Sequence, residues 1–350
     1  MRALLLLACW ARAPGFANAD TPLHAFASFS MVTGLEFGAD STRLLVSGWD
    51  VKMWDVASGR MLRDFAMLAG RAALSQDGRR VAAGEKKLEP GSSLLKVWDS
   101  GDGSEVLSLD VATHGLNEGV NCVDFSPDGA KVAVAGGAGP VKVFDVASGS
   151  ELHSIDIPSG SRVVAFDPSG TTLGIGRTKK LLLWNLETET LAREVDGGDT
   201  LYDFAFSSHG QALVLGSGNS RWVKLVNATT GEATHSITHD VSVHSVAISA
   251  DGAKFASGQA DGTVRLFDAG DGTEIRRISG AHDGYVLALA FSPDGTMLAS
   301  GGQDDTARVW CIAEACDSSH FKTFANLASA GAPFSLVPTV ACLSLLAFFS

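Results

Sequence analysis

Seven copies of one unit, polar turns at fixed places in each unit and short apolar runs between those turns predict an all-β fold for this chain of 350 residues. The expected architecture is a seven-bladed β-propeller of four-stranded antiparallel blades, closed by an N-terminal strand. The composition agrees, because 45% hydrophobic side chains suffice for a large core and 39 glycines fit many tight turns. A net charge of −12 disfavours nucleic acid as a partner.

The first marker of the unit is a large apolar residue, usually followed by Asp or Asn, at the end of a short apolar run. It falls at Trp54, Trp98, Phe144, Trp184, Val226, Phe267 and Trp310, so neighbouring copies are about 42 residues apart. A hairpin turn such as Ser126-Pro127-Asp128-Gly129 precedes each marker, since Pro presets φ and Gly accepts a positive φ. A second turn and a further strand follow it. Four short strands cannot bury their own faces, so the copies must pack in a ring.

Closure of the ring needs one more strand, because the seventh copy ends near Ile312. The segment Leu23 to Phe26 resembles Leu152 to Ile155, which is the outermost strand of the third copy. Pairing it with the last copy would remove an open sheet edge. The segment His320 to Phe324 is a rival for this place. We expect the N-terminal strand, because its distance to the next turn matches that of the other copies.

The pairs Trp54-Asp55 and Trp98-Asp99, the Ser-Pro-Asp-Gly turns and Ala281-His282 make residues 20–312 resemble the WD40-repeat family. The resemblance implies a non-catalytic scaffold for protein–protein interaction, without a cofactor. It also implies a hydrogen-bonded structural tetrad in the last copy, formed by His282, Ser300, Asp304 and Trp310. The sixth copy departs from this pattern. It keeps His239, Ser257 and Asp261 but has Phe267, which carries no N–H to donate.

In that family, the loops between the second and third strands lie on one rim, beside the loops that lead into each blade. Copies two to five supply basic residues there, and copies six and seven supply acidic ones. We therefore expect the basic arc to bind an acidic or phosphorylated segment of a partner protein. A solvated mixture of loop charges is the alternative. The candidate binding residues are Trp49, Lys86, Lys87, Arg177, Lys179, Lys180, Arg221 and Trp222, and the acidic residues are Asp240, Asp261, Asp283, Asp304 and Asp305.

The sequence contains no nucleophile elbow, zinc-protease, P-loop or dinucleotide motif. His235, His239 and His244 lie within ten residues, but spacing alone does not bring them together, and we expect no catalytic or metal site. A propeller enzyme or a ligand-binding protein that acts at the central channel stays open as an alternative.

The two ends raise a further alternative, a secreted or surface-anchored recognition module. Residues 1–19 have the charged, apolar and small-residue parts of a signal peptide. Residues 313–350 form a C-terminal tail that ends in an apolar segment and meets part of a lipid-anchor pattern. These ends favour the secretory pathway over the cytoplasm for an otherwise monomeric propeller. In that compartment Asn227 would be a glycosylation acceptor, and Cys311 and Cys316 could pair.

Overall fold

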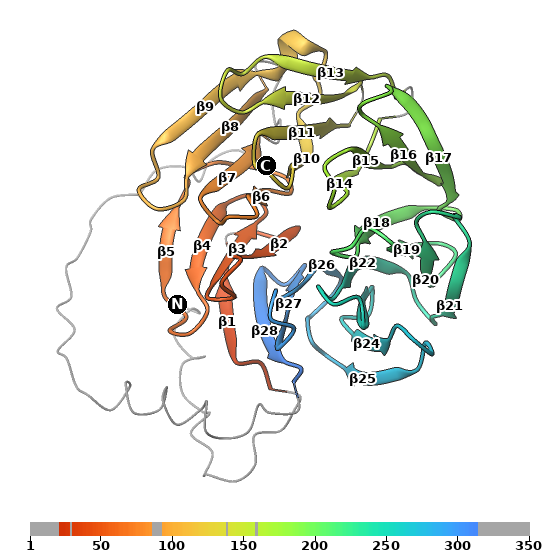
Figure 1. Cartoon of the computed structure of the whole chain (residues 1–350). Coiled ribbons are helices and arrows are strands. Elements are labelled where there is room, and N and C mark those ends of the chain that lie inside the picture. Colours follow the sequence, from red (N-terminus) through yellow and green to blue (C-terminus); the bar gives the residue numbers. More distant parts are fainter. Residues whose placement is uncertain (1–20, 29, 86–92, 138, 158–159, 314–350) are drawn as a thin grey trace, which may run out of the picture.

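The computed structural model describes residues 21–28, 30–85, 93–137, 139–157 and 160–313. Seven four-stranded sheets lie in a ring around a central axis (Figure 1). All paired strands of these sheets are antiparallel. The prediction of an all-β, seven-bladed propeller is confirmed.

The blades follow one another along the chain. Blade 1 comprises β2 (Gly34–Phe37), β3 (Arg43–Ser47), β4 (Val51–Asp55) and β5 (Met61–Asp64). Blade 2 comprises β6 (Ala73–Leu74), β7 (Arg80–Gly84), β8 (Leu94–Asp99) and β9 (Glu105–Asp110), and the 3₁₀ helix η1 (Val111–His114) leads out of it. Blade 3 comprises β10 (Val120–Phe125), β11 (Lys131–Gly136), β12 (Val141–Asp145) and β13 (Glu151–Ile155). Blade 4 comprises β14 (Val163–Phe166), β15 (Thr172–Gly176), β16 (Lys180–Asn185) and β17 (Thr190–Asp196).

The last three blades complete the ring. Blade 5 comprises β18 (Leu201–Phe206), β19 (Ala212–Ser217), β20 (Trp222–Asn227) and β21 (Ala233–Thr238). Blade 6 comprises β22 (Val243–Ile248), β23 (Lys254–Gln259), β24 (Val264–Asp268) and β25 (Glu274–Ile278). Blade 7 comprises β26 (Val286–Phe291), β27 (Met297–Gly302), β28 (Thr306–Cys311) and, from the other end of the chain, β1 (His24–Ala27). The first strand listed for each blade lies next to the central channel.

The hairpin between the first two strands of a blade is held by its own polar residues. In blade 3 the Ser126 hydroxyl donates to Asp128 and accepts the backbone N–H of Lys131 at 2.9 Å. Gly129 closes the turn at φ 68°, a conformation that costs glycine little. The same serine-to-aspartate bond recurs at Ser75, Ser249 and Ser292. These turns all lie at one end of the ring, which we call the lower face.

The N-terminal strand closes the ring, as expected from the sequence. In β1, His24 to Ala27 pair with Val309 to Thr306 of β28. Phe26 is 2% exposed, and its ring lies 5.2 Å from that of Trp54 in blade 1. The two ends of the described chain thus meet in one sheet, and no inner strand of blade 7 loses its partner. The rival segment, His320 to Phe324, lies outside the described residues.

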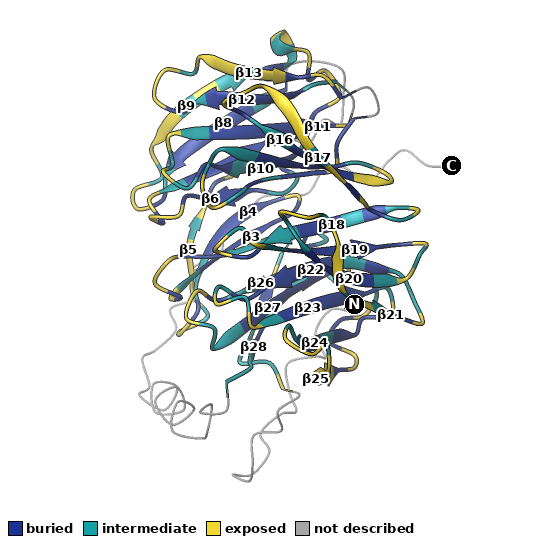
Figure 2. Cartoon of the chain, turned by 45° about the vertical axis from the view of Figure 1, so that its right-hand side comes forward, coloured by how far each residue is buried: buried dark blue, intermediate teal, exposed yellow. Residues whose placement is uncertain are grey.

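The outermost strands form the circumference and are much more exposed than the inner ones (Figure 2). In blades 1 to 6 the pairing of this strand shifts beside the repeat marker, as it does between Val97 and Trp98. A bulge on an edge strand twists it and discourages pairing with another chain. Contacts between blades also fix the ring. For example, Arg193 Nη1 donates to the carbonyl of Thr230 at 2.8 Å.

None of the described residues forms a helix that is long and apolar enough to cross a membrane. The predicted signal peptide, residues 1–19, and all but the first residue of the tail 313–350 lie outside the described residues. Both therefore stay predictions.

Candidate functional site

The upper end of the central channel gathers one side chain or glycine from every blade. Each lies four residues before the last residue of its inner strand, and all seven line one pocket of about 590 Å³. They are Thr33, Gly70, Asn121, Arg162, Tyr202, His244 and Leu287. Loops between second and third strands complete the rim of this pocket through Gly137, Arg177 and Thr178. We call it the upper mouth.

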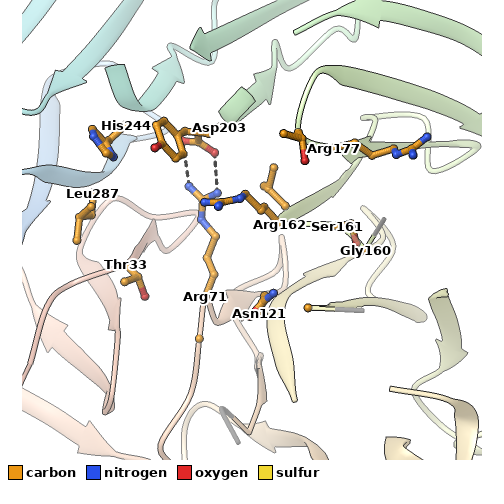
Figure 3. A pocket seen from close by; sticks show the side chains of 15 residues that line it. Thr33, Arg71, Asn121, Gly160, Ser161, Arg162, Arg177, Asp203, His244 and Leu287 are labelled. Carbon is orange, nitrogen blue, oxygen red and sulfur yellow. Dashed lines mark hydrogen bonds and ion pairs between the residues drawn. The ribbon is translucent and has the colours of Figure 1, made fainter. Parts of the chain in front are cut away.

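A half-buried ion pair crosses the channel just inside the upper mouth (Figure 3). Arg71, before β6 in blade 2, donates to both carboxylate oxygens of Asp203 in blade 5, at 2.7 and 3.2 Å. Asp203 is 2% exposed and also accepts the backbone N–H of Val246 at 3.0 Å. Burial opposes the charged guanidinium, but the Asp203 carboxylate outweighs it and raises the pKa of Arg71. The bidentate pair ties opposite sides of the ring together.

Aromatic rings form a stack along one side of the upper mouth. The rings of Tyr202 and His244 lie 4.5 Å apart at 15°, and those of His244 and Tyr285 lie 4.6 Å apart at 17°. The Arg162 guanidinium lies 5.3 Å from the centre of the Tyr202 ring. Burial, followed by the charge of Arg162, lowers the pKa of His244, so that this imidazole is neutral at pH 7. Four consecutive blades therefore contribute to one ordered wall.

The hydrogen bonds of the upper mouth are incomplete. Ser161 is 4% exposed, and its hydroxyl has no hydrogen-bond partner in the described structure. The buried hydroxyl oxygen of Thr33 is likewise unpartnered there. Arg162 contacts Tyr202, but within the described ranges its guanidinium makes no ion pair with a carboxylate. Buried polar groups of this kind normally have partners, and Trp54 Nε1 and Ser93 Oγ, which lie away from the upper mouth, also lack one.

The lower half of the channel has a different chemistry. Its pocket, of about 740 Å³, is lined by apolar side chains, by the lower-face turns and by two half-buried carboxyl groups. Glu36 accepts the backbone N–H of Leu74 at 2.7 Å, and Asp124 accepts that of Phe166 at 2.7 Å. Burial raises the pKa of Glu36 to about 8 and that of Asp124 to about 7. These carboxyl groups link neighbouring blades.

The rim residues predicted from the sequence lie at different places. Arg177 lines the upper mouth, but Figure 3 shows its side chain extending away from Arg71 and Arg162. Trp49 is 41% exposed, and Lys179 and Arg221 are exposed on the rim. Four other predicted residues are outside the described ranges or already engaged. Lys86 and Lys87 lie outside the described residues, Lys180 pairs with Glu194, and Trp222 is half-buried with Lys224 Nζ 4.0 Å from its ring.

The acidic rim residues are partly engaged. Asp240, Asp261, Asp283 and Asp305 are exposed. Asp304 is turned inward, where it accepts from His282 Nδ1 at 2.8 Å and from Arg308 at 3.1 Å. The structure thus removes Asp304 from the charges that a partner could meet.

The four residues of the tetrad are joined by hydrogen bonds in blade 7. The indole N–H of Trp310 donates to Ser300 at 2.8 Å, Ser300 lies 2.7 Å from His282 Nε2, and Asp304 accepts from His282 Nδ1. In blade 6 fewer hydrogen bonds join the corresponding residues. His239 Nε2 contacts Ser257 at 2.9 Å, but its Nδ1 lies 3.2 Å from the carbonyl of Ile237. Asp261 instead accepts the backbone N–H of Thr263 at 3.0 Å.

The described residues hold no group of three or more His, Cys, Asp and Glu side chains that could bind a metal ion. The three histidines that are close in sequence lie in three different environments. His244 belongs to the aromatic stack, His239 to blade 6, and His235 packs against Gly272. Cys122 in the channel is a buried free thiol, and burial raises its pKa to about 11, so it is a poor nucleophile at pH 7.

Two modification predictions concern residues away from the upper mouth. Asn227 lies at the turn after β20, where its carbonyl oxygen accepts the N–H groups of Thr229 and Thr230 at 2.9 Å each. Cys311 is disulfide-bonded. Cys316 lies outside the described residues, so its pairing with Cys311 stays a prediction, as does glycosylation of Asn227.

Comparison with known proteins agrees with the repeat and the ring. The family described as WD domain, G-beta repeat matches residues 104–145, 231–268 and 272–311. Each match begins at or before the outermost strand of one blade and ends with the third strand of the next, which is why an N-terminal strand must complete the last blade. Three matched repeats and a ring of seven four-stranded blades support a WD40-repeat β-propeller family.

Curated relatives match parts of the chain. The chain is 28% identical over 156 residues to the small ribosomal subunit protein RACK1 of Glycine max, covering 45% of this chain and 41% of that protein. It is 24% identical over 241 residues to the serine-threonine kinase receptor-associated protein of Gallus gallus, covering 67% and 66%. It is 31% identical over 167 residues to protein tipD of Dictyostelium discoideum, covering 46% and 27%. The chain thus spans less than two thirds of the length of each.

Sequence reasoning placed the candidate site on the outer rim loops and missed the inner strands. Arg71, Arg162, Tyr202 and His244 carry no recognisable motif. They could have been found from the register of the repeat, because three of them lie four residues before the end of an inner strand and Arg71 lies three before it. Their contacts across the channel could not have been predicted from the sequence, since these contacts depend on how the ring closes.

Proposed function

We propose that this propeller is a non-catalytic scaffold that binds partner proteins through its upper rim, with the upper mouth at the centre of the contact. The observation that carries the proposal is the charge of the upper mouth. Among the described residues that line it, the guanidinium groups of Arg71 and Arg162 lie near a single carboxylate, Asp203, in a chain whose net charge is −12. Such a local excess of guanidinium groups favours an acidic or phosphorylated segment of a partner.

The exposed rim supports the same proposal. Trp49 and Lys179 are available at the surface, and aromatic and basic side chains are typical of strongly contributing contact residues. Several relatives carry names that refer to assemblies, such as a ribosomal subunit protein and a receptor-associated protein. An interaction role is consistent with those names. The identity of a partner for this chain does not follow from them.

A charge-reversal experiment tests this role. Partners would be captured from the native source with a photo-crosslinking residue in place of Trp49, in the parent chain and in a Lys179→Glu, Lys180→Glu variant. The matched control reverses Lys131 and Lys254, which lie beside the lower-face turns. We expect the rim variant to lose the captured proteins and the lower-face variant to keep them. Equal capture by both variants contradicts the proposal.

A further inference from the structure

The lower half of the channel is a cavity to which every blade contributes at one level. The residue before the last of each inner strand lines it. Five of these residues are alanines and two are carboxylic acids; they are Glu36, Ala73, Asp124, Ala165, Ala205, Ala247 and Ala290. The alanines leave room in the middle of the ring. The resulting volume of about 740 Å³ is typical of sites for small ligands.

The wall of this cavity is apolar next to that level. Each inner strand ends in a large apolar residue, which is Phe in five blades, and all seven of these residues line the cavity. Phe206 and Phe291 are only half-buried there. A wall of this kind favours the apolar body of a ligand, because burial of apolar surface is favourable.

Glu36 and Asp124 are the polar groups at the level of the alanines, on blades 1 and 3. One oxygen of each carboxyl accepts a backbone N–H of the next blade, from Leu74 and from Phe166, at 2.7 Å in both cases. Neither carboxyl forms an ion pair with another described residue. A carboxylate offers about four acceptor positions, so both groups can accept further donors.

The other titratable groups around this cavity do not neutralise the two carboxyls. Arg71 is held by both oxygens of Asp203. Burial raises the pKa of the Cys122 thiol to about 11, so it is uncharged at pH 8. Asp167, in the lower-face turn of blade 4, is a further acid. Within the described ranges β14, β22 and β26 add no titratable side chain to the lining.

The two carboxyls consequently resist ionisation. Burial, followed by the charge of Asp124, raises the pKa of Glu36 to about 8, and burial raises the pKa of Asp124 to about 7. The effect of Asp124 on Glu36 also means that the two groups are close enough to interact. A cation placed beside them would stabilise both charged forms.

We propose that the lower half of the channel binds a small organic amine, with its ammonium group beside Glu36 and Asp124 and its apolar body against the alanines and phenylalanines. A primary ammonium has three N–H donors and one positive charge, so it can donate to both carboxyls at once. A metal ion fits less well, because no third His, Cys, Asp or Glu side chain completes the group within the described ranges. The lower-face turns border this cavity, so the site lies at the opposite end of the channel from the rim of the scaffold role.

Binding of this kind depends on pH. At pH 6 both carboxyls are protonated in most molecules, whereas an alkylammonium keeps its proton up to about pH 10. The ionised fraction of Asp124 rises by about tenfold between pH 6 and pH 8, because its pKa is about 7. We therefore expect the affinity for an amine to rise by about tenfold over the same range.

The test titrates the full chain at pH 8 and pH 6, with protein amide chemical shifts as the readout. The probes are 2-phenylethylamine, its neutral counterpart 2-phenylethanol, and N-acetyl-lysine methylamide, which stands for a lysine side chain of a partner protein. At pH 8 we expect 2-phenylethylamine to bind with a Kd on the order of 1 mM or below. The alcohol should bind about tenfold more weakly because it lacks the charge, and the lysine probe about tenfold more weakly because it lacks the aromatic body.

Three variants locate the site, and a fourth controls for charge. Glu36→Gln and Asp124→Asn keep an acceptor for the N–H of the next blade but lose the charge, and each should weaken binding of 2-phenylethylamine by about fivefold to tenfold. Ala290→Leu fills part of the cavity and should weaken it by about tenfold without a change of charge. Glu232→Gln removes an exposed charge from the turn after β20 and should change it by less than about twofold.

Several results would overturn the inference. These are no binding of 2-phenylethylamine by the parent chain at pH 8, equal binding by Asp124→Asn and Glu232→Gln, or an affinity that does not rise from pH 6 to pH 8. Equally tight binding of 2-phenylethanol would show that the carboxyls do not recognise the ligand, and equally tight binding of the lysine probe would show that the apolar wall does not. The scaffold role is tested separately, by partner capture with the Lys179→Glu, Lys180→Glu variant.

Discussion

The hydrogen-bonded tetrad of blade 7 leads to a prediction about stability, and blade 6, which lacks the tryptophan, provides the comparison. Replacing Ser300 with Ala removes the acceptor of the Trp310 indole N–H and the partner of His282 Nε2, both of which are 2% exposed as residues. Replacing Ser257 in blade 6 removes a partner from His239 only, because Phe267 has no donor. The two serines are equally buried, at 0% exposure.

The magnitudes follow from the number of buried polar groups left without a partner. Each costs about 1–3 kcal/mol, so Ser300→Ala should destabilise the protein by about 2–6 kcal/mol and Ser257→Ala by about 1–3 kcal/mol. For a domain of this size, 1 kcal/mol corresponds to roughly 2 °C in the thermal midpoint. The expected excess for Ser300→Ala over Ser257→Ala is therefore about 2–6 °C in a thermal melt.

A double-mutant cycle isolates the contribution of the indole. Trp310→Phe reproduces the arrangement of blade 6, where Phe267 follows the same register. On that background Ser300→Ala should cost no more than Ser257→Ala does in the parent chain, which gives a coupling of about 1–3 kcal/mol between positions 300 and 310. If the two serine substitutions cost the same, or if positions 300 and 310 are not coupled, the hydrogen bond from Trp310 to Ser300 does not contribute to stability and the reasoning is refuted.

Three further predictions concern pH and packing. His239 is buried, which lowers its pKa to about 4 from 6.5, so the folded state resists protonation and stability should fall by about 2–3 kcal/mol from pH 7 to pH 4.5; His239→Gln should reduce this loss in unfolding titrations. Burial raises the pKa of Glu36 to about 8, so stability is lost as pH rises from 4.5 to 8. Glu36→Gln can still accept the backbone N–H of Leu74, and the variant should be more stable than the parent by about 1–3 kcal/mol at pH 9 but not at pH 4. Gly218→Ala should displace Tyr202 from the stack, and an NMR titration should show the pKa of His244 moving up toward its ordinary value.

The repeat was sufficient to predict the fold, because its markers are local. A turn such as Ser126 to Gly129 is held by bonds within six residues, and Pro, Asp and Gly carry the necessary backbone preferences. Closure by Leu23 to Phe26 was also predictable, since the copies count one strand too few and this segment resembles an outermost strand. Both inferences needed only periodicity and neighbouring residues.

The departures came where a side chain chooses among partners in space. The sequence of blade 6 retains Asp261, yet His239 bonds to the carbonyl of Ile237, and Asp261 caps its own turn through Thr263. Asp304, by contrast, turns inward because His282 and Arg308 both reach it. The same residue type at the same repeat position thus has two roles, and the surrounding donors decide between them.

The site itself was hidden for a related reason. The fold needs an apolar or small residue at most positions of an inner strand, but four residues before its end the side chain faces the channel mouth and packs against no core. The seven residues found there are chemically unrelated, from Thr33 and Gly70 to Arg162 and Tyr202. The repeat pattern does not fix most of these side chains, although Gly70 is an exception, since a Cβ there would lie 2.4 Å from the carbonyl oxygen of Asn121. Because the fold leaves the other identities open, this least regular ring of residues in the repeat protein is the place where its recognition chemistry should be sought.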